Sequence, residues 1–143
     1  MIYSPPALRT GEDGAVLQPF EVVTAKMLPA IRARLAQVLL DEYKMKQVEV
    51  AKHLGITQAA VSHYKTASRG IDPELMRVFP EIDVYVRDMA AKIAEGMPQM
   101  EQIQSLSTLV EGLMQTRRFC EYHKKIATID PQCNICFPMP PRP

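Results

Sequence analysis

Residues 47–66 read QVEVAKHLGITQAAVSHYKT, and this stretch decides the fold of the chain. Its pattern predicts a helix, a tight turn and a second helix. Gly55 stands where the first helix should end and where the backbone often needs a positive φ, which glycine adopts without steric cost. The hydroxyl of Thr57 can then cap the second helix. Val61 and Tyr64 lie three residues apart, so we expect both to point into the core.

The outer face of the second helix is the first candidate binding surface. Its side chains are polar or very small, which are the types that read base edges in the major groove of DNA. The alternative is an ordinary pair of packed helices with a glycine stop. The outer-face residues are Thr57, Gln58, Ala59, Ser62, His63 and Thr66.

This stretch resembles the helix-turn-helix of phage-repressor-like (Cro-repressor-like, XRE-type) transcriptional regulators. The resemblance covers about residues 27–79 and includes the motifs A-x3-G-x5-V, Gln47 at the start of the first helix and TQAAVS at the start of the second. It implies a compact five-helix domain that binds duplex DNA, usually as a dimer on an operator. It also implies a phosphate contact for Gln47 and a base contact for Gln58. Lys46 departs from the Ser or Thr cap that is usual in the family, and it adds a cation beside the expected DNA backbone.

Charge is distributed unevenly along the chain. The net charge is only +1, but residues 26–70 hold eight Lys or Arg and three acids, whereas residues 71–119 hold five bases and eight acids. The first segment is therefore +5 and the second −3. Positive charge on the segment with the motif is what binding to phosphates requires, although lysines on a solvated helix face give the same count. The candidate DNA-binding residues are Lys46, Gln47, Thr57, Gln58, Ala59, Ser62, His63, Lys65 and Thr66.

Prolines and glycines divide the chain into segments and predict an all-α fold. Helices are expected at about residues 29–43, over the two motif helices, from Asp72 to Phe79, and at 81–95 and 99–118. This gives a phage-repressor-like bundle, two further helices and a small C-terminal loop. The predicted segments are an N-terminal arm (1–25), a helix-turn-helix DNA-binding domain (26–80), a helical dimerisation region (81–118), a Cys/His site (119–137) and a disordered tail (138–143).

The two helices after the motif, at about residues 81–95 and 99–118, carry apolar stripes that are wider than a 50-residue motif domain needs. The stripe of the last long helix is the main candidate for an interface. Its members are spaced by threes and fours, so they share one face. Repressor-like proteins bind two half-sites, and we therefore expect this stripe to contribute to a homodimer. Packing against the first domain is the alternative, and the two do not exclude each other. The stripe consists of Ile103, Leu106, Val110 and Leu113.

All three cysteines of the chain lie near its C-terminal end, together with a histidine. Cys120 and His123 form C-x2-H, and Cys133 and Cys136 form C-x2-C. Two residues between ligands let both reach one tetrahedral metal ion. This ligand set favours zinc, with an iron–sulfur cluster as the close alternative. A redox pair of Cys133 and Cys136, or three ordinary buried thiols, would give the same sequence.

The remaining features exclude several classes of function. No run of about 18 apolar residues exists, and the first residues lack the pattern of a secretory signal, so we expect a cytoplasmic protein. An odd number of cysteines argues against a disulfide framework. No catalytic triad, phosphate loop, paired catalytic carboxylates or small-molecule substrate site stands out, and we expect no enzyme. The alternatives to a regulator are a helical protein–protein adaptor, as in antitoxins and coactivators, and a thiol oxidoreductase that uses the C-x2-C pair.

Overall fold

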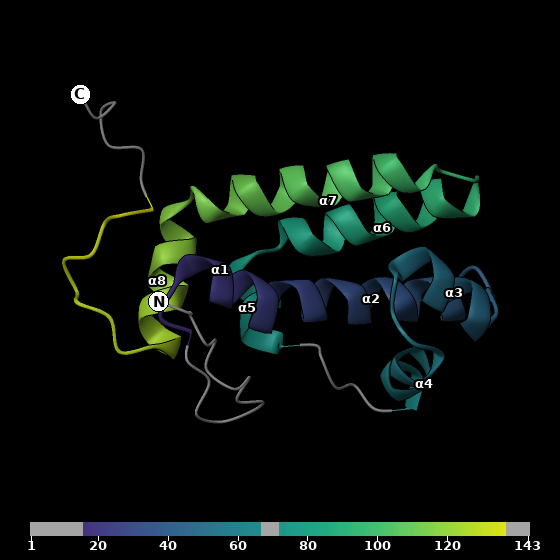
Figure 1. Ribbon diagram of the computed structural model, residues 1–143, viewed down its shortest axis with the longest axis horizontal. Helices are drawn as coiled ribbons and strands as arrows, with labels where there is room; N and C mark the ends of the chain where they lie inside the picture. The colour runs from purple at the N-terminus through teal and green to yellow at the C-terminus, as the bar shows by residue number, and fades with distance from the viewer. Residues whose placement is uncertain (1–15, 67–71, 137–143) are drawn as a thin grey trace, which may run out of the picture.

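The computed structural model describes residues 16–66 and 72–136, and all regular structure within these ranges is helical (Figure 1). This confirms the all-α class. The first fifteen residues of the expected arm and the expected disordered tail (138–143) lie outside the described residues. Within the described ranges, no helix is long and apolar enough to cross a membrane. The elements are α1 (Pro19–Val22), the π-helical turn η1 (Val23–Met27), α2 (Leu28–Asp41), α3 (Gln47–Leu54), α4 (Gln58–Thr66), α5 (Pro73–Val78), α6 (Glu81–Ala94), α7 (Gln99–Met114) and α8 (Arg117–Ile126).

Helix α2 runs through the middle of the molecule, with α3 and α4 at one end and α8 at the other (Figure 1). It packs most extensively on α6 and also contacts α3 and α4. Three of its buried residues are alanines, whose small side chains let neighbouring helices approach closely. A helix that is apolar around most of its circumference is expected to be surrounded by others. The buried residues of α2 are Ala30, Ile31, Ala33, Leu35, Ala36, Val38, Leu39 and Leu40.

Helical structure begins earlier than the sequence predicts. The sequence predicts an arm up to residue 25 and a first helix that starts near Pro29. In the structure, α1 begins at Pro19 and continues through η1 into α2. Pro29 has no N–H, so it interrupts the α-helical ladder, and the turn before it widens into a π-helix. Val22 and Met27 are completely buried. Burial of these side chains stabilises a helix that the prolines and glycines alone do not predict.

The C-terminal part also differs from the prediction. The expected helix at 99–118 ends at Met114, and a separate helix, α8, starts at Arg117. The Thr116 hydroxyl accepts a hydrogen bond from the backbone N–H of Phe119 at 3.3 Å, which caps the new helix. The change of direction lets Phe119 and Tyr122 enter the core. Residues 119–126, expected to form a loop, are therefore part of a packed helix.

Helix α8 is tied to α5 by a shared carboxylate. The Tyr122 hydroxyl donates to Asp72 Oδ2 at 3.0 Å. Asp72 Oδ1 accepts from the backbone N–H groups of Glu74 and Leu75 at 3.0 and 3.2 Å, and so caps α5. Burial of Tyr122, together with its hydrogen bond to Asp72, raises the pKa of the phenol, which therefore remains a donor at all physiological pH values.

Replacing Asp72 should therefore cost more stability than replacing its partner. Asp72→Ala removes the cap of α5 and leaves the buried Tyr122 hydroxyl without its acceptor, so we expect a loss of about 2 kcal/mol in the free energy of unfolding. Tyr122→Phe removes only the hydrogen bond and should cost about 1 kcal/mol. Urea denaturation measures both. An Asp72→Ala loss no larger than that of Tyr122→Phe would contradict the shared role.

Candidate nucleic-acid interface and thiol cluster

The turn between α3 and α4 has the geometry that the sequence predicts. Gly55 has φ 64° and ψ 34°, the left-handed conformation. The backbone N–H of Ile56 donates to the Ala51 carbonyl at 3.1 Å, which closes the end of α3. The Thr57 hydroxyl accepts from the backbone N–H of Ala60 at 3.1 Å and caps α4.

Buried valines hold the two helices on the core. Val50 of α3 and Val61 of α4 are fully buried, and Tyr64 is partly buried against the same core. The side-chain amide of Gln37, on α2, also donates to the Tyr64 carbonyl at 3.4 Å. The angle between α3 and α4 is therefore set by backbone geometry at the turn and by apolar contacts with α2.

A hollow of about 450 Å³ lies between the end of α2, the start of α3 and the side of α4 from Gln58 to Lys65. We call it the basic groove. It brings together four of the residues that the sequence singles out for DNA contact, which are Lys46, Gln47, Gln58 and Lys65. It also includes a third lysine, Lys44, which the sequence alone does not mark as a contact residue. The complete lining is Leu40, Lys44, Met45, Lys46, Gln47, Val48, Gln58 and Lys65.

The electrostatics of the basic groove favour an anion. Its lining contains three lysines and no acid. No salt bridge between described residues involves Lys44, Lys46 or Lys65, all of which are exposed. Lys46 occupies the N-cap position of α3, and its side chain makes no capping hydrogen bond. The acid in the first turn of α3, Glu49, is not part of the lining of the groove.

Lys44 enters the groove through an unusual backbone conformation. Its φ is 54°, the only positive φ of a non-glycine residue in the described part of the chain. The next residue, Met45, donates its backbone N–H to the Leu39 carbonyl at 3.0 Å, so the chain turns sharply after α2. In the sequence, the only indication that Lys44 belongs to the site is its closeness to Lys46 in Lys44-Met45-Lys46. The geometry of the turn shows that both lysines reach one hollow.

The remaining predicted contact residues lie along α4. Ala59 and His63 are exposed, and Ser62 is half-buried. The His63 ring lies edge-on to Tyr64, with 6.4 Å between the ring centroids. Thr57 is exposed, and its hydroxyl is engaged in the cap. Thr66 ends α4, and its side chain lies outside the described part of the structure.

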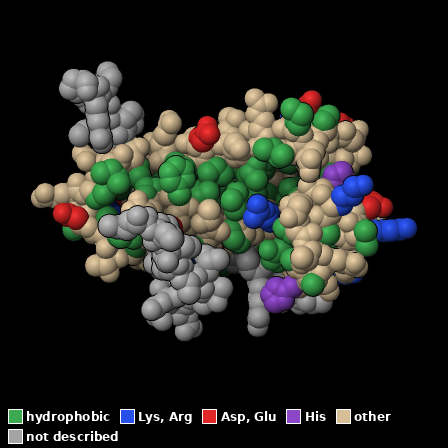
Figure 2. Space-filling model, in the orientation of Figure 1, with side chains coloured by type: hydrophobic (Ala, Val, Ile, Leu, Met, Phe, Trp, Pro, Cys, Tyr) green, Lys and Arg blue, Asp and Glu red, His purple; other side chains and the backbone are tan. Residues whose placement is uncertain are grey.

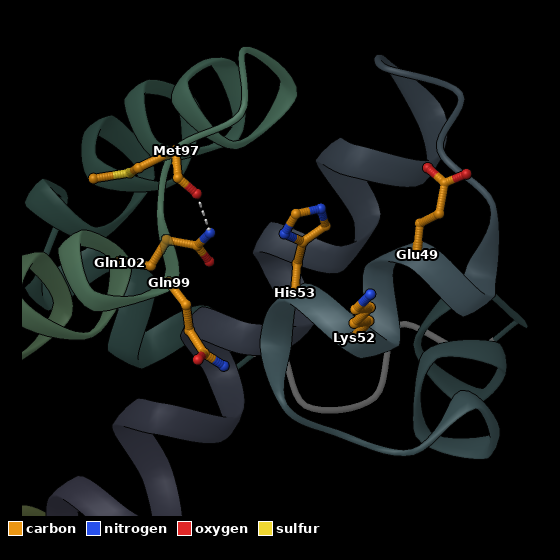
Figure 3. Close-up of a pocket in the computed structure, with 6 residues that line it drawn as sticks. All are labelled: Glu49, Lys52, His53, Met97, Gln99 and Gln102. Atoms are coloured by element: carbon orange, nitrogen blue, oxygen red, sulfur yellow. Dashed lines mark hydrogen bonds between the residues drawn. The ribbon is translucent and has the colours of Figure 1, made fainter.

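A second polar hollow, of about 470 Å³, lies between α3 and the beginning of α7 (Figure 3). The His53 ring stands between the two walls, and the Gln102 amide donates to the Met97 carbonyl at 2.9 Å. Because an acid and a base line it together, its charge does not select one class of ligand. The lining residues are Glu49, Lys52, His53, Met97, Gln99 and Gln102.

The three thiols lie in one neighbourhood at the other end of the molecule. Cys120 is buried on α8, and its Sγ donates to the Cys133 carbonyl at 3.7 Å. The turn before Cys133 is closed by its own N–H, which donates to the Asp130 carbonyl at 2.9 Å. Burial raises the pKa of the Cys136 thiol, and the neighbouring Cys120 and Cys133 thiols raise it further. All three cysteines are free.

His123 is engaged elsewhere. Its Nε2 lies 2.5 Å from the Val16 carbonyl oxygen, and its ring packs near that of Phe119, with 6.3 Å between the centroids. The side chain is only 6% exposed. Within residues 16–66 and 72–136, no three His, Cys, Asp or Glu side chains are spaced closely enough to hold a metal ion as they stand. The structure thus groups the thiols but does not place His123 among them.

The apolar stripe of α7 is divided by the fold. Val110 and Leu113 are buried within the chain, Leu106 is partly buried, and Ile103 is 61% exposed. Ile103 and Leu106 border a hollow of about 140 Å³ whose apolar walls come from α2, α3 and α6. Figure 2 shows hydrophobic side chains gathered along the middle of this face of the molecule, over α2 and α6.

Comparisons with known proteins assign no family to the chain. No protein-family model matches it, and neither curated proteins nor solved structures give a match. The features of the molecule that indicate a function are therefore the basic groove, the exposed face of α4 and the thiols.

Two glycine substitutions test the turn between α3 and α4. Neither Gly55 nor Gly112 has an atom within 4 Å of an added Cβ, so only the backbone conformation distinguishes them. Gly55→Ala should lower the free energy of unfolding by about 1 kcal/mol, because alanine disfavours the left-handed conformation. Gly112→Ala, in helix α7, should raise it by about 0.5–1 kcal/mol. Thermal or urea denaturation measures both, and equal signs would contradict this account of the turn.

Proposed function

We propose that this chain is a sequence-specific transcriptional regulator of the Cro-repressor-like kind, which binds duplex DNA as a homodimer. The observation that supports this most strongly is the basic groove. Three exposed lysines and two glutamines surround one hollow between the start of α3 and the side of α4, with no acid in its lining. A DNA phosphate satisfies such a site, because it accepts hydrogen bonds from ammonium, amide and backbone N–H groups at once.

In this proposal, the groove positions the protein and α4 reads the sequence. Lys44, Lys46 and Lys65 neutralise phosphates of one strand, and Gln47 donates to the same backbone. Gln58 lies at the start of α4 and at the edge of the groove, so its amide can reach a base edge when α4 enters the major groove. The exposed Ala59 and His63 extend the reading face.

The distribution of ion pairs fits this orientation. Several basic side chains outside the groove are paired with acids: Arg34 with Asp83, Arg87 with Glu42 and Asp83, and Lys92 with Asp88. The groove lysines have no such partners among the described residues. The ammonium groups of the groove are therefore available to a polyanion.

A protein partner is the second candidate for this surface. Val48, in the lining of the groove, is 61% exposed, and an exposed apolar side chain favours protein contact. Binding to DNA depends steeply on salt because counterions are released from the duplex, whereas an apolar protein contact does not. Salt dependence therefore separates a regulator from an adaptor.

Substitutions in the groove and on α4 should weaken DNA binding in two different ways. Lys46→Ala removes a phosphate contact, so affinity should fall for all duplexes and the slope of log K against log salt should flatten by about one unit. Gln58→Ala removes a base contact and should cost about 1–3 kcal/mol on the preferred site, with little effect on random DNA. Fluorescence anisotropy with a duplex selected from a random pool measures both.

Lys92→Ala is the matched control, because Lys92 is paired with Asp88 and lies outside the groove. It should leave both affinity and salt slope close to wild type. Equal weakening of selected and random duplexes by Gln58→Ala would show that Gln58 only positions the protein. If the wild-type protein binds no duplex at low salt, the proposal that it binds DNA is contradicted.

The homodimer rests on the exposed end of α7. Ile103 is largely exposed beside an apolar hollow, and Met100, one turn earlier, is 82% exposed. Burial of these side chains against a second copy would remove apolar surface from water. A two-fold dimer also doubles the DNA contact, because each copy reads one half-site. Val110 and Leu113, which are buried in their own chain, are not part of this proposed interface.

Ile103→Glu should therefore produce a monomer that retains its fold. The side chain is exposed in the single chain, so a carboxylate there costs little stability, whereas burial of a charge in a dimer interface is strongly unfavourable. Sedimentation velocity and circular dichroism report the two effects. Thr108→Glu, at another exposed position of α7, is the control and should stay dimeric. A wild-type chain that sediments as a monomer at working concentrations would contradict the dimer.

A further inference from the structure

We infer that Cys120, Cys133 and Cys136 bind one thiophilic divalent cation, Zn²⁺ by the chemistry of its ligands, through three thiolates, with His123 outside the coordination sphere. This site is separate from the basic groove, at the end of the molecule where α8 lies (Figure 1). It does not depend on DNA binding.

The three thiols come from two segments of the chain, helix α8 and the segment after it, which lie against each other. Helix α8 fixes Cys120, which is 7% exposed, and the chain after α8 turns at Asp130 to bring back Cys133 and Cys136. Two contacts hold this returning segment against α8. Cys120 Sγ donates to the Cys133 carbonyl at 3.7 Å, and Lys124 Nζ donates to the Pro131 carbonyl at 2.7 Å.

The returning segment can close on an ion with little loss of packing. Pro131, Gln132, Asn134 and Ile135 are exposed, so they make few apolar contacts that oppose a small movement, whereas Cys136 packs against the core. In a three-thiolate zinc site each sulfur lies about 2.3 Å from the metal. No three such side chains of the described residues are spaced for this as they stand, so the returning segment must move toward Cys120 when the ion binds. Such sites commonly reach their final geometry as the metal binds, because metal binding and local folding are coupled.

The environment of His123 is the reason to leave it out of the ligand set. Its Nε2 is committed to the Val16 carbonyl, and the ring is buried beside Phe119. Its hydrogen bond joins α8 to Val16, in the segment before α1, which is a structural role. With three sulfur ligands, the fourth position of a tetrahedral ion would then be taken by water or by a ligand from outside the chain.

The ligand chemistry distinguishes this site from a redox pair. Thiolate sulfur favours Zn²⁺ over hard cations such as Mg²⁺ or Ca²⁺. A Cys133–Cys136 disulfide would use two thiols and leave Cys120 without a role. Cation binding would use all three thiols, including the buried Cys120, which already contacts the returning segment.

The test uses the full chain, purified anaerobically and stripped of metal, with Co²⁺ as a spectroscopic probe and Zn²⁺ as the competitor. We expect one Co²⁺ per chain, a sulfur-to-cobalt charge-transfer band that Zn²⁺ abolishes, and a zinc X-ray absorption spectrum with three sulfur ligands and no imidazole. Each of Cys120→Ser, Cys133→Ser and Cys136→Ser should weaken Co²⁺ binding by about tenfold or more. Asn134→Ser, an exposed position between two of the cysteines, should not.

His123→Gln provides the sharpest comparison. If it retains the charge-transfer band at wild-type intensity, the three-thiolate site stands. A band lost in this variant while its helix content is unchanged, or imidazole scattering in the wild-type zinc spectrum, would overturn the exclusion of His123. Protein with three titratable thiols that binds no Co²⁺, or a brown protein with iron and sulfide, would overturn the single-cation site.

Discussion

The burial of α2 is the constraint on which the rest of the structure depends. This helix exposes little apolar surface because α6, α3 and α4 cover it, and its alanines allow them to approach. The pairing of α3 with α4 is fixed against it by Val50 and Val61 rather than by contacts between α3 and α4 alone. The groove follows from this arrangement, because the sharp turn after α2 brings two lysines beside the start of α4. The surface proposed to bind DNA is thus a product of core packing.

The two proposed sites lie at opposite ends of α2, and polar contacts of α8 connect the thiols to the middle of the chain (Figure 1). Tyr122 donates to the carboxylate that caps α5, and Arg118 bonds both the Val78 carbonyl and the Glu81 carboxylate. The Arg118 guanidinium lowers the pKa of Glu81, so this ion pair stabilises the fold at neutral pH and is lost as pH falls through the folded pKa.

Local signals in the sequence predicted much of this structure, and long-range packing accounts for what they missed. Gly55, Thr57 and Asp72 mark helix ends through backbone and capping preferences, which depend on few neighbours. The early start of the first helix and the break before α8 depend on burial of Met27 and Phe119, which no local pattern reveals. For the same reason, periodicity could not tell that Val110 faces the core of its own chain while Ile103 stays exposed. Lys44 belongs to the groove only because the chain turns there with a positive φ.

The proposed DNA contact can be mapped most directly by amide chemical shifts of the wild-type protein during titration with a duplex selected from a random pool. The account predicts that shift changes concentrate at the start of α3, around Gln47, and along the exposed face of α4 from Gln58 to His63. It also predicts smaller changes for the buried face of α4 and none beyond the end of α7. Changes confined to α6 and α7, or no saturable change at low salt, would contradict the claim that this surface reads DNA.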